Sequence, residues 1–158
     1  MAVLAPSIPA FAASGHACSV GTLSNGTTND GTNEGMFCAD VSNSTNGSSV
    51  IVNMGAEGIC QNAFSSTSEP VRCANVDITF ALWTQGEEIA AATMECGHNG
   101  TLCSTGRTTA SIAISVPLTA CEQVWTVVYA GSTVELPTTG AGVTLGANLG
   151  SGHITICP

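Results

Sequence analysis

Few residues of this sequence have the type and spacing that chemistry requires. The chain holds 158 residues and three histidines, His16, His98 and His153. His98 is the best placed of them, because it stands two residues after a cysteine and three after Glu95. A histidine beside a carboxylate can act as a general base or as a metal ligand. The plainer interpretation is a polar loop residue held by a disulfide, and nothing in the sequence brings the three histidines together.

Other arrangements that catalysis needs are missing from the sequence. The G-x-S-x-G motif of α/β-hydrolases is absent. The only adjacent carboxylates, Glu87 and Glu88, would point to opposite faces of a strand. The acidic loop around Asn29-Asp30-Gly31 does not have the spacing of a calcium loop. We therefore predict no catalytic residue, no metal ligand and no cofactor, and we favour a protein that is not an enzyme.

Trp83 and Arg107 are the remaining candidates for an interaction site. Trp83 falls on the polar side of an alternating segment, and an exposed aromatic residue there could belong to an interaction patch. Together with Trp125 it could form a platform for carbohydrate, although in a chain with 4% aromatic residues both tryptophans could equally lie in the core. Arg107, or Leu102 beside it, could anchor a partner if the loop that precedes Arg107 protrudes.

Eight widely spaced cysteines predict disulfide bonds. The closest two enclose six residues, so the C-x-x-C pairs of a zinc site are absent. Many connectivities are open, and we expect nearest neighbours to pair because hairpins bring them together. The expected pairs are Cys18–Cys38, Cys60–Cys73, Cys96–Cys103 and Cys121–Cys157. Such a framework indicates an oxidising compartment.

The first residues agree with secretion. Residues 1–13 are apolar and uncharged, and they contain an A-x-A sequence that resembles a signal cleavage site. A secretory signal remnant is expected there, with an apolar tail as the alternative. We expect residues 14–158 to form a single β domain of a secreted, extracellular protein.

The charge of the chain limits its partners. Eleven acidic residues stand against two basic ones, and the formal net charge is −9. Polyanions are repelled by such a chain, so nucleic acid and anionic membrane surfaces are poor partners. No apolar run reaches the roughly 18 residues of a membrane-spanning helix, so we expect no membrane insertion.

The apolar pattern predicts β-strands that must position these residues. Residues 71–84 give the clearest strand, with alternating apolar and polar residues over 76–82. Residues 108–116 alternate again, and residues 124–130 form a strongly apolar run. Residues 88–96 contain Glu and Ala, which favour helix. We nevertheless prefer a returning strand there, because a helix would be under three turns long.

The N-terminal half gives weaker signals. Asn46-Gly47 predicts a hairpin turn within residues 42–49, between strands over 36–41 and 50–52. Residues 14–35 are rich in Gly, Asn and Thr and predict mostly loop, with at most one edge strand. The whole pattern predicts an all-β, disulfide-stapled antiparallel sandwich or barrel-like fold of about nine short strands.

The C-terminal third contains three segments that resemble a known group of proteins. The segments are VWTVVYAGSTVELP, GVTLG and SGHITICP, with looser matches upstream at ICQ, RCA and CSTGR. They resemble small, secreted, cysteine-rich proteins of actinobacteria whose function is uncharacterised. The resemblance implies a secreted disulfide-bonded β domain and brings no catalytic residue with it.

The function that these observations favour is a non-enzymatic binding or structural role. The partner would be an unidentified protein, polymer or small molecule. Two alternatives stay open at this point. One is an extracellular hydrolase with a His/carboxylate site, and the other is an inhibitor or toxin-like module with a disulfide-held loop.

Overall fold

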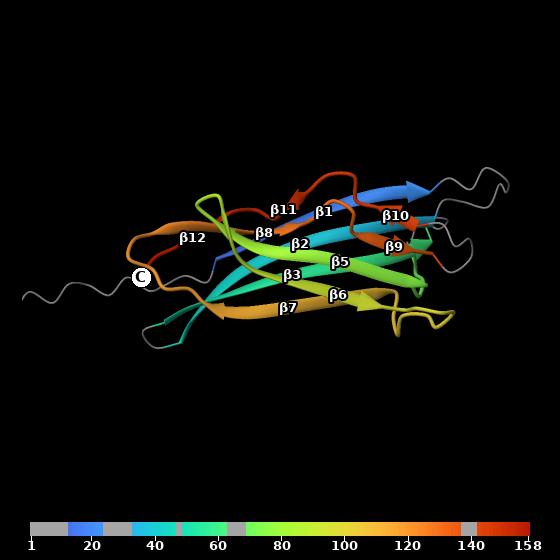
Figure 1. Cartoon of the computed structure of the whole chain (residues 1–158), viewed down its shortest axis with the longest axis horizontal. Helices are drawn as coiled ribbons and strands as arrows, with labels where there is room; N and C mark the ends of the chain where they lie inside the picture. Colours follow the sequence, from blue (N-terminus) through green and yellow to red (C-terminus); the bar gives the residue numbers. More distant parts are fainter. Residues whose placement is uncertain (1–12, 24–32, 47–48, 63–68, 137–141) are drawn as a thin grey trace, which may run out of the picture.

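The fold is a sandwich of two antiparallel sheets (Figure 1). The computed structural model describes residues 13–23, 33–46, 49–62, 69–136 and 142–158. These residues form strands and no helix. In chain order the strands are β1 (Ser14–Leu23), β2 (Asn33–Asn46), β3 (Ser49–Asn62), β4 (Glu69–Pro70), β5 (Asn75–Thr84), β6 (Glu87–Cys96), β7 (Arg107–Ser115), β8 (Glu122–Val128), β9 (Thr133–Glu135), β10 (Gly142–Thr144), β11 (Leu149–Gly150) and β12 (Ile154–Ile156).

Each sheet is built around one strand. In the first, which we call sheet A, β3 pairs with β2 on one side and with β7 and the short β4 on the other, and β1 pairs with β2 at the edge. In the second, sheet B, β5 pairs with β6 on one side and with β8 and β9 on the other. β11 and β12 pair with β8, and β10 pairs with β9. The predicted all-β fold is confirmed in its sandwich form.

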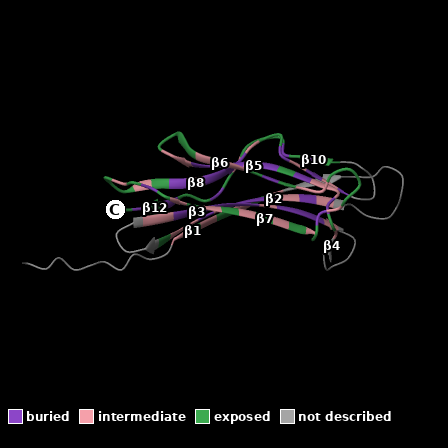
Figure 2. Cartoon of the chain, turned by 60° about the horizontal axis from the view of Figure 1, so that its bottom comes forward, coloured by how far each residue is buried: buried purple, intermediate pink, exposed green. Residues whose placement is uncertain are grey.

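The core lies between the sheets (Figure 2). The alternation predicted for β5 is confirmed, because Val76, Ile78, Phe80 and Leu82 are all fully buried. Residues 88–96 belong to strand β6, so the helix alternative is wrong. Its inward positions include Met94, which is 5% exposed and packs in the same core.

The N-terminal half holds the longest strands, and here the prediction of short strands is wrong. β2 and β3 each contain 14 residues and pair along their whole length, from Asn33↔Asn62 to Asn46↔Ser49. The predicted turn over 42–49 is strand up to Asn46, and β1 is a full edge strand. Glycines inside β3 weaken its strand signal in the sequence, so its full length is not predicted. A Cβ on Gly58 would lie 2.8 Å from Ile78 Cδ1, so the glycine makes room for the facing sheet.

Two buried serines replace main-chain acceptors where the ladders of sheet B are interrupted. The Thr79 amide donates to Ser132 Oγ at 3.2 Å, and the Thr126 amide donates to Ser151 Oγ at 2.9 Å. Both serines are 5% exposed. A buried amide without an acceptor is costly, so these hydroxyls allow the chain to leave and rejoin the ladder.

Four disulfides join the pairs predicted from nearest neighbours, namely Cys18–Cys38, Cys60–Cys73, Cys96–Cys103 and Cys121–Cys157. No cysteine is left free. Four intramolecular disulfides are typical of proteins from extracellular or other oxidising compartments. Within the described part of the chain, no helix is long and apolar enough to cross a membrane. Residues 1–12 and the acidic loop at 29–31 lie outside the described residues.

Candidate functional site

Among the described aromatic residues, the phenylalanines lie in the core, and the tryptophans and the tyrosine lie at the surface. Phe37 and Phe80 lie between the sheets and are 1% and 0% exposed. The two tryptophans and the single tyrosine of the chain, Trp83, Trp125 and Tyr129, are only half-buried. Their strand neighbours at even-numbered positions point into the core, so these three side chains point outward from sheet B. All the amphipathic aromatic residues of the protein therefore share one outer face.

These rings form a continuous group. Trp83 on β5 and Trp125 on β8 are directly opposite each other in the ladder, so their side chains are neighbours. The ring of His153, just before β12, lies with its centroid 4.4 Å from that of Trp125, at an angle of 46°. Tyr129 follows β8 on the same side. We call the group formed by Trp83, Trp125, Tyr129 and His153 the aromatic surface.

Hydrogen bonds fix part of the aromatic surface. Trp83 Nε1 donates to the Tyr129 hydroxyl at 3.0 Å, and that hydroxyl donates to the carboxylate of Glu88. The Trp83–Tyr129 bond spans the row of Ala81 and Val127. These two residues point away from the core, yet they are only 0% and 8% exposed. Trp83 and Tyr129 are the next outward-pointing residues after Ala81 and Val127 along their strands.

The same contacts shift the ionisation of the tyrosine. Burial raises the pKa of Tyr129 above its ordinary value of 10.0, and the hydrogen bond and negative charge of Glu88 raise it further. The hydrogen bond from Trp83 acts in the opposite direction. The pKa of Tyr129 thus keeps the hydroxyl protonated at neutral pH, and the aromatic surface carries no phenolate charge.

A hollow adjoins one end of the aromatic surface. It measures about 390 Å³ and is lined by Gln85, Cys121, Glu122, Gln123, Trp125 and His153. Glu122 Oε2 accepts a hydrogen bond from Thr84 Oγ1 at 3.1 Å, which holds that carboxylate in place. Amide and carboxylate groups thus surround the exposed part of an indole. Ligand sites commonly combine an aromatic wall with a few polar groups in this way.

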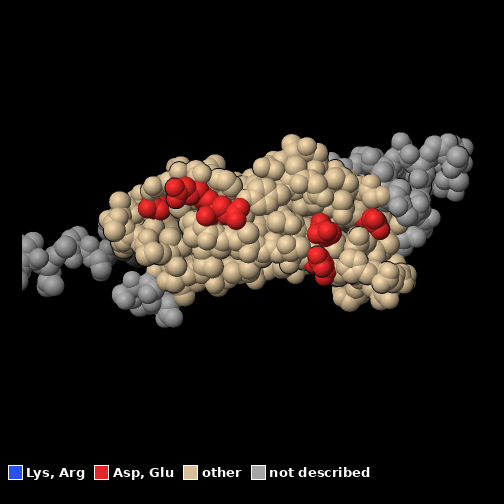
Figure 3. All heavy atoms as spheres, viewed as in Figure 1, with Lys and Arg blue, Asp and Glu red and all other residues tan. Residues whose placement is uncertain are grey.

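The charge on this side of the protein has one sign. Figure 3 views the outer face of sheet B and shows acidic residues in two groups, with no Lys or Arg among them. The acidic residues on the strands of this sheet are Asp77, Glu87, Glu88, Glu95, Glu122 and Glu135. The arginines lie elsewhere, with Arg107 on β7 of sheet A. A polyanionic ligand would be repelled from this face.

His98 and Glu95, predicted as a possible pair, have different neighbours in the structure. His98 is exposed and forms a main-chain bridge with Thr101 in the loop after β6. Glu95 is exposed on β6, where it is opposite Asp77. Among the described residues, no hydrogen bond or ion pair joins the His98 and Glu95 side chains. Their arrangement offers no oriented acid–base pair.

The loop before β7 is tied down at its base. Arg72 Nε donates to the Cys103 carbonyl at 2.7 Å, and the Cys103 amide donates to the Cys73 carbonyl at 2.8 Å. Leu102 is half-buried. Arg107 lies within β7 and pairs with Glu57, at 2.7 Å between Nε and a carboxylate oxygen. The two suggested anchors are therefore a packed side chain and one member of an ion pair.

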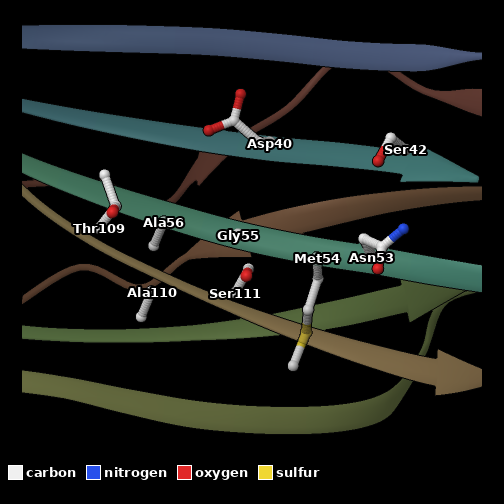
Figure 4. Close-up of a pocket in the computed structure, with 9 residues that line it drawn as sticks. All are labelled: Asp40, Ser42, Asn53, Met54, Gly55, Ala56, Thr109, Ala110 and Ser111. Atoms are coloured by element: carbon white, nitrogen blue, oxygen red, sulfur yellow. The ribbon is translucent and has the colours of Figure 1, made fainter.

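A second hollow lies on the opposite outer face, on sheet A (Figure 4). It measures about 250 Å³, and its lining comes from β2, β3 and β7, with Gly55 between Asp40 and Ser111. The missing side chain of Gly55 creates the depression. No aromatic residue lines it, so it offers a ligand less contact area than the aromatic surface does.

Trp83 is predicted from the sequence as an interaction residue, but most of its partners in the aromatic surface are not. The sequence suggests a platform of Trp83 and Trp125, but it does not connect Tyr129, Glu88 or His153 with either tryptophan. The alternation of side chains between the two faces of β5 and β8 is a sequence signal that predicts both tryptophans to point outward. Only the pairing of β8 with β12 brings His153 beside Trp125, and pairing is not visible in a single sequence. No protein-family model, curated protein or solved structure matches this chain.

Proposed function

We propose that this protein is a secreted extracellular domain that binds an uncharged carbohydrate polymer, without catalysis, on the aromatic surface. The observation that carries the proposal is the placement of both tryptophans and the only tyrosine on one outer face. The described phenylalanines, which have no polar atom, are buried instead. This division follows from function more readily than from packing, because a fold with so few aromatic residues would gain stability by burying them.

Sugar rings suit this surface chemically. The C–H face of a pyranose ring is apolar and packs against an aromatic ring, while its hydroxyls need donors and acceptors at the edge. Trp125 supplies the ring, and Gln85, Glu122 and Gln123 supply polar groups around it. The Trp83–Tyr129 hydrogen bond holds a second indole in place. A rigid aromatic side chain loses little entropy when a ligand binds.

The charge distribution supports an uncharged ligand. The outer face of sheet B carries carboxylates and, among the described residues, no Lys or Arg (Figure 3). Sulfated or uronic-acid polymers and nucleic acids would be repelled. Glu88 is engaged by Tyr129 and Glu122 by Thr84. Carboxylates held in this way serve as fixed acceptors for hydroxyl groups, which supports a binding role.

Tryptophan fluorescence gives a direct test, because both tryptophans of the chain belong to the aromatic surface. The protein would be titrated with soluble oligosaccharides from neutral β-glucan, xylan, mannan and chitin, and with an anionic polysaccharide as a comparison. We expect at least one neutral series to shift the emission in a saturable way. We expect the anionic polymer to have no effect at low ionic strength, where repulsion is strongest.

Variants locate the binding. Trp125→Ala should lower the affinity for the neutral ligand by about tenfold or more, which corresponds to about 1.4 kcal/mol. Thr109→Ala, exposed on the outer face of sheet A, is the matched control and should bind as the native protein does. Unchanged affinity in Trp125→Ala, with the fold intact by circular dichroism, would refute the proposal. So would tighter binding of the anionic polymer than of every neutral one.

A further inference from the structure

Four side chains form a compact cluster at the edge of sheet A, on the face opposite to the aromatic surface. His16 and Asp40 are directly opposite each other on β1 and β2, and so are Cys18 and Cys38 in the next row. All four point to the outer side of the sheet, because the intervening Ala39 and its neighbours point into the core. The cluster therefore consists of a disulfide with a histidine–carboxylate pair beside it.

The contacts within the cluster have a definite order. His16 Nδ1 contacts the carboxylate of Asp40. The other ring nitrogen, Nε2, lies 3.0 Å from the sulfur of Cys18. A carboxylate that accepts from one nitrogen sets the orientation of the ring and leaves the other nitrogen directed at its target. Here that target is a disulfide sulfur.

The two sulfurs differ in access. Cys18 is exposed, whereas Cys38 is only 2% exposed. An attacking group from solvent therefore reaches Cys18. The ring nitrogen of His16 and both sulfurs lie within 4.8 Å of one another. This is also metal-ligand spacing, but two sulfurs bonded to each other are not thiolates, and thiolates are the form that binds metal.

Two of the other disulfides have polar neighbours that are not histidines. The Cys60 sulfur contacts the Glu135 carbonyl at 3.6 Å, and the Cys96 sulfur contacts Thr108 Oγ1 at 3.3 Å. In the described part of the chain, no other disulfide sulfur has an imidazole at hydrogen-bond distance. His98 is only two residues from Cys96 in the sequence, yet the contact seen between His16 and Cys18 has no counterpart there.

We propose that Cys18–Cys38 is a redox-active disulfide that exchanges with thiols, with His16 as its proton donor and Asp40 as the residue that positions His16. In the first step a thiolate attacks Cys18 Sγ. A new sulfur–sulfur bond joins the thiol to Cys18, and the Cys18–Cys38 bond breaks. Cys38 leaves as a thiolate and takes up a proton from the imidazolium of His16, whose ring nitrogen lies within 4.8 Å of both sulfurs.

The second step uses the histidine again, after it has regained a proton from solvent. A second thiolate attacks the substrate sulfur of the mixed disulfide, and Cys18 leaves as a thiolate. The imidazolium of His16, with Nε2 at 3.0 Å in the starting disulfide, stabilises and protonates that leaving group. In total two thiols lose two electrons and become one disulfide, while Cys18 and Cys38 gain them as thiols. A cationic neighbour makes a cysteine both a better leaving group and a more reactive nucleophile in the reverse direction.

Other charged groups near the cluster are few. Glu57 on β3 is opposite Cys38, and its charge is compensated by Arg107 on β7 at 2.7 Å. Asp40 is the carboxylate in contact with His16, and from sheet B the main chain of Gly152 approaches β1 at Gly15. His16 is therefore the group that these contacts place beside the Cys18 sulfur as a proton donor. The rate of exchange, divided by the concentration of attacking thiolate, should fall as the imidazole loses its proton.

The test measures which disulfide opens first. The native protein would be incubated with glutathione or dithiothreitol and a metal chelator, quenched with an alkylating reagent, and mapped by mass spectrometry. We expect Cys18–Cys38 to open about tenfold or more faster than the other three. With glutathione, the trapped mixed disulfide should be on Cys18, and the alkyl label on Cys38.

Three variants separate chemistry from structure. His16→Gln should slow opening of Cys18–Cys38 by about tenfold or more and remove its pH dependence. Asp40→Asn should have a smaller effect in the same direction. His98→Gln is the matched control, because this histidine also lies two residues from a cysteine. It should leave the opening rate of Cys18–Cys38 and its pH dependence unchanged. Thermal melting of the oxidised variants checks that each one is folded.

Two results would overturn the proposal. The first is opening of all four disulfides together, at the rate of global unfolding. The second is an opening rate of Cys18–Cys38 that is the same in His16→Gln and in the native protein at every pH. Neither outcome depends on carbohydrate binding, which is measured on the other face of the sandwich.

Discussion

Thr126 of sheet B donates a hydrogen bond from Oγ1 to the main-chain carbonyl of Asp40 in sheet A, at 2.6 Å. Thr126 is fully buried, so this bond crosses the interior of the sandwich. Trp125, next to Thr126 on β8, belongs to the aromatic surface, and the Asp40 side chain belongs to the His16 cluster. The bond therefore ties together the strands that carry the two proposed sites.

Replacing this threonine should destabilise the protein. Thr126→Val keeps the shape of the side chain but leaves the Asp40 carbonyl without its buried donor, which costs about 1–3 kcal/mol of the free energy of unfolding. Urea unfolding with an unchanged slope would measure the loss. Thr155→Val, exposed on β12, is the control and should change stability by less than about 0.5 kcal/mol. Equal effects of the two substitutions would contradict the assigned role of the hydroxyl.

Ser151 should matter for a related reason. Its hydroxyl accepts the Thr126 amide at 2.9 Å where the ladder between β8 and its neighbours is interrupted. Ser151→Ala leaves that buried amide unpaired and should cost about 1–3 kcal/mol. Hydrogen exchange of the Thr126 amide should become faster than in Ser111→Ala, an exposed control on β7. Native protection of that amide in Ser151→Ala would show that another acceptor replaces the serine.

Gly58 permits the close approach of the two sheets. A Cβ there would lie 2.8 Å from Ile78 Cδ1 and 3.2 Å from Val134 Cγ1, both in the core. Gly58→Ala should therefore force these side chains to shift and cost about 1–3 kcal/mol, in spite of the better strand propensity of alanine. Gly146→Ala, with open space around the new methyl group, should be neutral or slightly stabilising. A Gly58→Ala protein with the melting temperature of the native chain would contradict this packing argument.

The sequence predicted the parts of the fold that depend on local pattern. The alternation at Val76–Leu82 predicted β5 and its buried face, and cysteine spacing predicted all four disulfides. The full length of β3 is not predicted, because Gly55 and Gly58 within it weaken the strand signal. These glycines lie in a strand because β3 pairs on both sides and because Ile78 fills the space beside Gly58. Both are tertiary effects, which a local sequence pattern does not reveal.

The candidate sites were less accessible to sequence reasoning than the fold. His98 is the candidate that the sequence favours, because it is near a cysteine and a glutamate in the chain. The histidine that contacts a sulfur is His16, and its carboxylate, Asp40, is 24 residues away. Strand register alone puts His16 opposite Asp40. The aromatic surface depends in the same way on register, because Trp83 and Trp125 meet only once β5 pairs with β8.

The ionisation of the single tyrosine gives a prediction in alkaline solution. Burial and Glu88 raise the pKa of Tyr129 above 10.0, so the folded state holds the phenolic proton more tightly than the unfolded chain does. The stability that results is fully present below pH 10.0 and is lost as the pH rises through the folded-state pKa. Tyr129→Phe should therefore lose less stability than the native protein over that alkaline range.

At neutral pH the same substitution should cost about 0.5–1.5 kcal/mol, because the hydrogen bonds with Trp83 and Glu88 are lost. Since the chain has one tyrosine, phenolate absorbance of the folded protein reports on Tyr129 alone. We expect its midpoint to lie above the midpoint of the reduced and denatured chain. Glu88→Gln removes the negative charge while keeping an acceptor oxygen, and it should lower the folded-state midpoint towards the denatured one. If native protein and Glu88→Gln titrate together, Glu88 does not act on the hydroxyl, and the hydrogen-bonded arrangement of the aromatic surface would have to be revised.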